Sequence, residues 1–295
     1  MSTVQRSDAV NTVSRQDTRV DGRHEEERAG FLAKYHNWVV NGGRLVLLVM
    51  LMALWQALSG PVLDPLVVSS PNAVYHQLVT WAQDGTLWSN TLITLEETLL
   101  GLLCGAVAGI GLGLVIGPLQ VVGRILDPFI LSIYSIPKVA LAPLFIVWFG
   151  IGLDMKVILA AITVFFLVFY NTVAGVRNVD PDLIDAVRLM GGKPTQIMVK
   201  VVIPSATGWI LTGLRVAIPY ALIGAVIGEL VASNIGLGYL IDESAAVFNI
   251  AGVFAALLIL TVFATVLNLF VNLLDRRMSR WKATVNLGGR RVIPQ

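Results

Sequence analysis

Three ionisable side chains lie inside long apolar segments of this sequence, where a charge needs a partner or a chemical role. They are Lys138, Arg215 and Glu229. A lysine or arginine near the centre of a bilayer costs about 2.5–3.5 kcal/mol on insertion scales, so such groups are expected to face protein or a water-filled cavity rather than lipid. A cation on the wall of such a cavity could bind a small anion, and the three residues are therefore candidates for a substrate pathway.

A structural role for the same charges stays open. Lys138 could bond a backbone carbonyl freed by Pro137 or Pro143, since proline provides no N–H to its helix. Arg215 could bond carbonyls at a helix end. Glu229 follows Arg215 by about 21 Å along a helix axis at 1.5 Å per residue, so those two side chains cannot pair directly.

Residues 180–204 form a polar segment between two apolar ones and hold a second group of candidate functional residues. Asp180 is a good helix N-cap, Pro181 suits the first helical position, and Gly191 supplies a stop. The apolar residues of this helix recur at i, i+4 and i+7 and are Leu183, Val187 and Met190. A helix of about ten residues is only about 15 Å long, too short to cross a bilayer, and its apolar face therefore needs a protein partner, which could be the chain itself or another subunit.

The composition is that of an integral membrane protein. Of the 295 residues, 56% are hydrophobic and 14% charged, and the mean hydropathy is +0.76. A phosphate-binding G-x-x-x-x-G-K-[ST] loop is absent from the sequence, because Gly192-Lys193 is followed by Pro194. Three histidines and one cysteine favour neither a metal cluster nor a Cys/His nucleophile. We therefore expect an all-α membrane protein that is not an enzyme, has no cofactor of its own and binds no nucleic acid.

Six apolar segments are candidate membrane spans. They cover approximately residues 45–58, 99–119, 125–150, 155–176, 206–232 and 250–274. The first is short for a span and could be mistaken for a signal-peptide core, but with residues 38–63 as its available length we expect a retained helix. The second has a glycine at every fourth position from Gly101 to Gly117, a spacing that lets helix backbones approach closely. The third contains three prolines and is expected to be a kinked helix buried in the bundle. Glu96 and Glu97, at the start of the second, are expected at the membrane interface.

The basic residues predict the orientation of these spans. Of the 21 Lys and Arg residues, all but Lys138, Lys156 and Arg215 lie in the N-terminal stretch, the connection after the second span, the 177–204 loop or the C-terminal tail. These segments share one side of the membrane when six spans alternate, and only Lys156 falls on the other side. Because basic loops remain in the cytoplasm, both termini and the 177–204 loop are predicted to be cytoplasmic.

The polar segment resembles the cytoplasmic signature of the permease subunits of ABC importers. Asp185-Ala186-Val187, then Gly191, then VVIP ending at Pro204 have the spacing of the family pattern Glu-Ala-Ala, Gly, Ile-x-Leu-Pro. The stretch DPFILSIYSIPKVALAPLFIVWFGIG is similar to the nitrate, sulfonate and taurine branch, as is GLRVAIPYALIGAVIGEL followed by Gly-Leu-Gly. The resemblance covers roughly residues 60–280.

This resemblance implies a type I ABC-importer permease bundle in the bacterial inner membrane. It implies a translocation pathway built from two permease copies, here expected as a homodimer, joined by a dimer of ATPase subunits and an extracytoplasmic binding protein. The 180–204 segment would couple the permease to the ATPase, where ATP is hydrolysed. The residues implied in that contact are Asp182, Asp185, Ala186, Arg188, Gly191 and Pro204. The substrate implied is a small anion such as a sulfonate, taurine or nitrate.

The domain organisation follows from the same patterns. Residues 1–35 are predicted to be a disordered cytoplasmic leader, residues 36–280 a transmembrane permease domain with its core at 90–275 and its coupling loop at 177–204, and residues 281–295 a cytoplasmic tail. A stand-alone secondary anion transporter that uses Lys138, Arg215 and Glu229 without ATP is the alternative function.

Overall fold

The computed structural model describes residues 39–61 and 64–278, and every regular element within these ranges is a helix. The predicted leader and tail lie outside the described residues. The chain divides into two compact units between residues 71 and 72. The first contains the helix Val39–Leu58, which is apolar and exposed along its length, and the short α2, Pro65–Val68. The side chain of Ser59, just after the first helix, donates to the carbonyl of Ser69, just after α2, at 2.6 Å.

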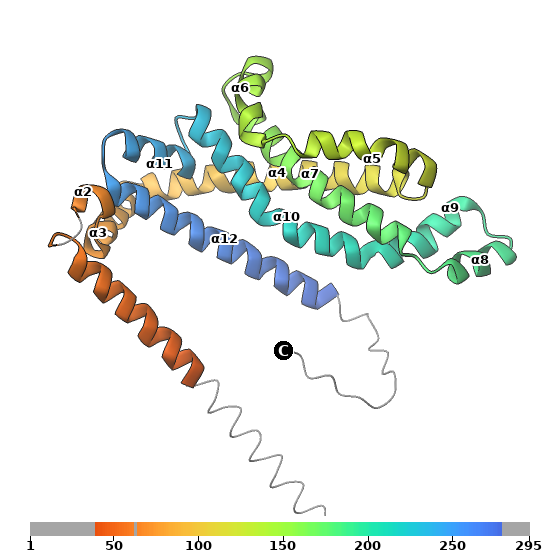
Figure 1. Cartoon of the computed structure of the whole chain (residues 1–295), viewed down its shortest axis with the longest axis horizontal. Helices are drawn as coiled ribbons and strands as arrows, with labels where there is room; N and C mark the ends of the chain where they lie inside the picture. The colour runs from red at the N-terminus through yellow and green to blue at the C-terminus, as the bar shows by residue number, and fades with distance from the viewer. Residues whose placement is uncertain (1–38, 62–63, 279–295) are drawn as a thin grey trace, which may run out of the picture. The chain divides into compact units, whose positions relative to one another are not determined.

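The second unit holds the remaining helices (Figure 1). They are α3 Pro71–Gln83, α4 Thr86–Ile116, α5 Gln120–Tyr134, α6 Lys138–Phe149, α7 Leu153–Arg177, α8 Pro181–Leu189, α9 Pro194–Ile197, α10 Ile203–Ala232, α11 Leu237–Ala246 and α12 Ile250–Met278. Across the described residues, five helices are long and apolar enough to cross a membrane, and α5 with α6 adds a sixth if the pair counts as one span. The expectation of an all-α bundle with about six spans is therefore confirmed.

Helix α7 lies between α4 and α10 and forms the centre of the unit. The glycine repeat of α4 faces it. A Cβ on Gly105 would lie 2.8 Å from Cβ of Val164, and one on Gly113 would lie 2.6 Å from Cβ of Thr172. On the opposite side of α7, a Cβ on Gly224 of α10 would meet the backbone of α7 at 2.6 Å. The predicted close approach of helix backbones is thus confirmed.

The third apolar segment differs from its prediction. It is not one kinked helix inside the bundle but two helices, α5 and α6, bent by 86°. Pro128 and Pro143 lie within the helices, and the bend falls at residues 135–137, where Pro137 is the N-cap of α6. Only Gly123 of α5 is buried, with Ala142 and Phe145 of α6. The apolar side chains of this segment are therefore mostly exposed in the single chain.

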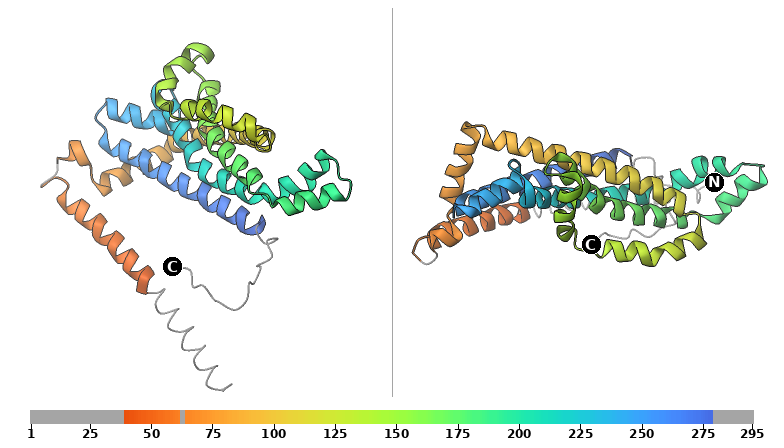
Figure 2. Two further views of the ribbon diagram at one scale, coloured as in Figure 1. Left: turned by 45° about the vertical axis from the view of Figure 1, so that its right-hand side comes forward. Right: turned by 90° about the horizontal axis from the view of Figure 1, so that it is seen from above.

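The segment Pro194–Ala232 is a continuous helical path of 39 residues that joins α9 to α10. At 1.5 Å per residue it is about 58 Å long, whereas the hydrocarbon core is about 30 Å thick. A π-helical turn, Met198–Val202, precedes Pro204, and the Ile203 N–H bonds the Met198 carbonyl across it. The excess length carries α8 and α9 away from α11, and both views in Figure 2 show them at opposite ends of the bundle.

Candidate functional site

Helix α8 is bounded by the signals expected from its sequence. The side chain of Asp180 accepts a hydrogen bond from the Asp182 N–H at 3.0 Å, and Pro181 takes the first helical position. At the other end the Gly192 N–H donates to the Val187 carbonyl at 2.9 Å. Gly191 between them has a φ of +78°, a conformation that side chains with a Cβ rarely adopt. The glycine therefore fixes where the chain leaves the helix.

The two sides of α8 differ from the predicted pattern. Ile184 and Val187 turn inward, whereas Leu183, Leu189 and Met190 are exposed, the last two to 89% and 86%. The predicted apolar face of Leu183, Val187 and Met190 is therefore divided, because Val187 packs on the chain itself whereas Leu183 and Met190 do not. The physical reason is that the chain itself covers one flank of this short helix.

The inward flank packs on a cluster formed by the end of α7 and the start of the long helix. Its buried members are Val176, Val179, Val201, Val202 and Ala206. Ile184 and Val187 pack against this cluster and hold α8 at the end of the bundle. The segment is thus anchored on one side and presents large apolar side chains on the other.

The six candidate coupling residues of this segment are accessible to solvent. Asp182, Asp185, Ala186, Arg188, Gly191 and Pro204 are all exposed. Arg188 donates to the Asp185 carboxylate at 3.1 Å, a surface pair of the kind that contributes little to stability. The structure therefore keeps these residues together beside the exposed leucine and methionine side chains, except for Pro204, which belongs to the start of α10.

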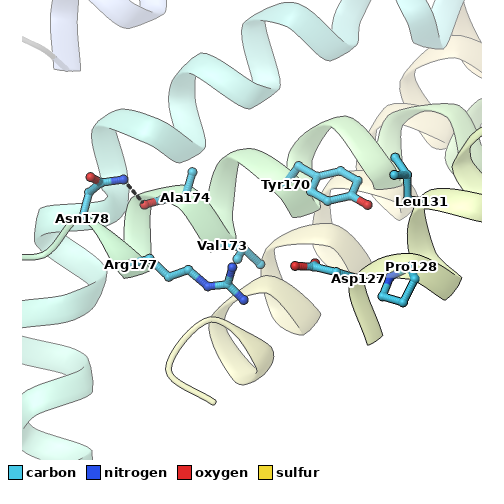
Figure 3. Close-up of a pocket in the computed structure, with 8 residues that line it drawn as sticks. All are labelled: Asp127, Pro128, Leu131, Tyr170, Val173, Ala174, Arg177 and Asn178. Atoms are coloured by element: carbon cyan, nitrogen blue, oxygen red, sulfur yellow. Dashed lines mark hydrogen bonds between the residues drawn. The ribbon is translucent and has the colours of Figure 1, made fainter. Parts of the chain in front are cut away.

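A cavity of about 550 Å³ lies beside the base of this segment, between α5 and α7 (Figure 3). Its lining residues are Asp127, Pro128, Leu131, Tyr170, Val173, Ala174, Arg177 and Asn178. The Arg177 guanidinium extends over Gly123, where any larger side chain would collide with it. The cavity wall therefore contains the carboxylate of Asp127, the guanidinium of Arg177 and the phenol of Tyr170. This polar wall lies near the end of α7, just before the chain enters α8.

The opposite end of the bundle contains a hydrogen-bonded junction around the N-terminus of α11. The N–H of Gly236 bonds the Asn90 side-chain oxygen at 2.6 Å, the N–H of Leu237 bonds the Thr94 hydroxyl at 2.9 Å, and the N–H of Gly238 bonds Glu229 at 2.6 Å. Thr94 in turn donates to Glu229 at 2.6 Å. Side chains of α4 and α10 therefore satisfy amides that the helix cannot satisfy itself.

A buried ion pair adjoins this junction. Glu97 of α4, expected at the membrane interface, is only 1% exposed and pairs with Lys156 of α7, which is 4% exposed. Lys156 also donates to the hydroxyl of Ser233 at 3.0 Å, and the Glu97 and Glu229 carboxyls interact. The pair lines a cavity of about 360 Å³ together with Glu96 and the loops at 151–153 and 232–235.

The remaining pathway candidates lie in separate surroundings. The Lys138 ammonium donates to the Tyr134 carbonyl at the end of α5 and lies 4.4 Å from the centre of the Tyr134 ring. Arg215 is partly buried on α10. Glu229 is 1% exposed within the α11 junction. Lys138 and Glu229 therefore have separate surroundings, and Lys138 bonds a carbonyl at the end of α5 rather than one at the i−4 position of Pro137 or Pro143.

Sequence analysis did not identify Asn90, Thr94 or Lys156. A signal was present, because Asn90, Thr94 and Glu97 recur at i, i+4 and i+7 and form a polar stripe on an apolar helix. Their partners on α10 and α11 are distant in the chain, and one sequence does not pair them. Among the described residues there is no group of three or more His, Cys, Asp or Glu side chains placed to hold a metal ion.

Comparison with known proteins adds sequence and fold relationships. Residues 105–280 match the sequence model of a family described as binding-protein-dependent transport system inner membrane component. The chain is 32% identical over 250 residues to the aliphatic sulfonates transport permease protein SsuC of Bacillus subtilis (strain 168), covering 84% of this chain and 90% of that protein. It is 31% identical over 244 residues to the taurine transport system permease protein TauC of Escherichia coli (strain K12), covering 81% and 89%.

A third relative carries a different substrate name. The riboflavin transport system permease protein RibX of Chloroflexus aurantiacus is 34% identical over 245 residues, covering 82% of this chain and 91% of that protein. Among solved structures, the fold is similar to a chain of the MetNI methionine ABC transporter in an inward facing conformation, with a TM-score of 0.54 and 20% identity over 68% of this chain and 95% of that chain. An amino acid ABC transporter gives the same TM-score at 21% identity, covering 69% and 97%.

Proposed function

Because the chain belongs to the family of binding-protein-dependent transport system inner membrane components, we propose that its α8 segment couples a separate ATPase to the translocation pathway. The chain is the permease component of an ABC importer, a multi-span membrane protein. ATP hydrolysis belongs to the partner subunit in this proposal, and the permease supplies the pathway and the moving helices.

The observation that carries this proposal is the two-sided environment of α8. Ile184 and Val187 are held by the bundle, whereas Leu189 and Met190 are the most exposed large apolar residues of the segment. A short helix that offers apolar side chains at fixed spacing is the kind of element that binds in a groove of a partner protein. Asp182, Asp185 and Arg188 border the apolar residues and would set the orientation of docking.

The assembly proposed has two copies of this chain, two ATPase subunits and an extracytoplasmic binding protein. The mostly exposed apolar surface of α5 and α6 supports a second permease copy, because a patch of this kind needs cover from protein or lipid. The basic residues of the 177–204 loop and of both termini support a cytoplasmic location for α8 and the chain ends. The junction around α11 would then face the extracytoplasmic side.

The substrate proposed is a small anion such as a sulfonate, taurine or nitrate. Two relatives named for sulfonates and taurine support it, while the relative named for riboflavin indicates that overall identity does not decide the substrate. Lys138 and Arg215 are the cations proposed to line or border the pathway. For Glu229 we propose a positioning role through α11, since its oxygens are already occupied by Thr94 and Gly238.

The test is reconstitution of the permease with its ATPase and binding protein in proteoliposomes. Gly191→Trp and Asp185→Lys are expected to abolish uptake and substrate-stimulated ATP hydrolysis while the permease remains inserted, because both changes alter the docking segment. Gly85→Trp is the matched control, since Gly85 also has a positive φ and open space around it but lies at the start of α4. Normal coupling in both α8 variants would refute the proposal.

A further inference from the structure

The junction near α11 contains more negative than positive side chains. Glu97 and Glu229 are each 1% exposed and Lys156 is 4% exposed. If both carboxyls were ionised, the three groups would carry a net charge of −1 in a site that is largely shielded from bulk water. An uncompensated buried charge is strongly unfavourable, so such a group neutralises or finds a counter-charge.

Within residues 39–61 and 64–278, no second cation acts on this site. Among the described residues, the charged groups that act on Glu97 are Lys156 and Glu229, and the charged group that acts on Glu229 besides its carboxyl neighbour is the same lysine. Glu96 lines the adjoining cavity but is itself acidic and exposed. No charged side chain of α6 or α11 acts on either carboxyl within the described part of the chain.

The surroundings of Glu229 stabilise an ionised carboxylate better than those of Glu97. It accepts hydrogen bonds from the Thr94 hydroxyl and the Gly238 N–H, both at 2.6 Å. It also lies at the N-terminal end of α11, where the helix dipole favours negative charge. Gly236 leaves room for the carboxyl there, since any side chain at that position would collide with it. These donors favour the ionised form of Glu229.

Glu97 has the opposite surroundings. One of its oxygens contacts the Lys156 ammonium, while its other oxygen accepts no hydrogen bond from a described residue. Thr94, one helical turn before Glu97 on α4, donates to Glu229, and the two carboxyl groups act on one another electrostatically. A protonated carboxyl is a donor, so a proton on Glu97 would replace a repulsive contact with an O–H bond to Glu229 and make the three groups neutral together.

We propose that the Glu97–Lys156–Glu229 cluster binds one proton between its two carboxyl groups, and that this proton holds α4, α7, α10 and α11 together at this end of the bundle. The proton comes from water through the cavity of about 360 Å³ beside the cluster and returns to water when it is released. Release leaves two carboxylates against one ammonium and loosens the α11 junction. The stabilisation is therefore present when the site is protonated and is lost as the pH rises.

The test compares purified full-length protein with Glu97→Gln, which keeps a neutral side chain and a hydrogen-bond donor at the site. We expect hydrogen exchange of the α11 amides in the wild type to accelerate relative to this variant as the pH rises, by at most about tenfold per pH unit in the range where the site releases its proton, and to level off once the proton is lost. The ratio at each pH removes the intrinsic pH dependence of exchange. Glu96→Gln is the matched control, because Glu96 is the neighbouring exposed carboxylate at the same cavity, and it should keep the wild-type profile.

A second measurement needs no folded variant. Infrared difference spectra of the wild type should show a protonated carboxyl band that is lost at high pH. A pH-independent exchange ratio would overturn the proposal, as would an equal flattening of the profile by Glu96→Gln or absence of the carboxyl band. Stabilisation by sodium over choline without that band would also overturn it, because a metal cation would then supply the missing charge.

Discussion

The hydrogen bonds at the α11 junction predict how much stability is lost in Thr94→Val, an isosteric change that removes one hydroxyl. Thr94 is fully buried, accepts from the Leu237 N–H at 2.9 Å and donates to Glu229 at 2.6 Å. A buried N–H left without an acceptor costs about 1–3 kcal/mol, and a hydrogen bond to a charged group contributes about 1.5–3 kcal/mol. Because the two effects share one site, we expect a combined loss of about 3–5 kcal/mol.

Thr172→Val is the matched control for this change. Thr172 is equally buried, but its hydroxyl bonds only the Val168 carbonyl of its own helix, at 2.7 Å, so its removal should cost less than about 1 kcal/mol. At about 2–4 °C per kcal/mol for a chain of this size, the difference of about 2–5 kcal/mol should make Thr94→Val melt roughly 4–20 °C below Thr172→Val. Thr94→Ser, which retains the hydroxyl, should melt near the wild type.

The assay is thermal melting in detergent combined with hydrogen exchange of residues 236–238. Faster exchange should be confined to Thr94→Val and concentrated at Leu237, whose amide loses its acceptor. Equal melting temperatures for the two valine variants, or unchanged exchange at Leu237, would refute the conclusion that the side chains of α4 hold α11.

Two further predictions concern orientation and the pathway. In a background with Cys104→Ser, Phe248→Cys should react with an impermeant thiol reagent from outside intact cells, because Phe248 is 74% exposed at the α11 end. Met190→Cys should react only after the membrane is opened. Labelling of Met190→Cys in intact cells would reverse the proposed orientation. Lys138→Met and Arg215→Met should each reduce uptake without loss of membrane abundance or basal ATP hydrolysis if the cation borders the pathway. Loss of abundance, or full uptake in both variants, would instead favour the structural hypothesis.

The sequence predicted the features that depend on local patterns. The glycine repeat indicated close helix packing, and Asp180, Pro181 and Gly191 set the ends of α8 as expected. The identity of the packing partner was not predictable, because the contacts of α4 with α7 and of α7 with α10 join segments far apart in the chain. Periodicity alone states which side of a helix packs, not what packs on it.

Two features of the structure were not predicted. The burial of Glu97 was not foreseen because its partners, Lys156 and Glu229, come from other helices and are recognised only after folding. The bend of 86° between α5 and α6 could not be located from the prolines, since Pro128 and Pro143 are accommodated inside helices and only Pro137 adjoins the turn.

The 39-residue path from Pro194 to Ala232 connects the α8 end of the bundle with the α11 end through continuous helical backbone. If α8 couples an ATPase as proposed, this path would act as a lever of up to about 58 Å, and a rigid tilt of about 5° about one end would move the other end by about 5 Å. A small rotation at α8 would then reach the α11 junction as a displacement comparable to the rise of one helix turn. The π-helical turn at Met198–Val202 lies near the α8 end of this path, and its stiffness would set how much of the rotation reaches α11.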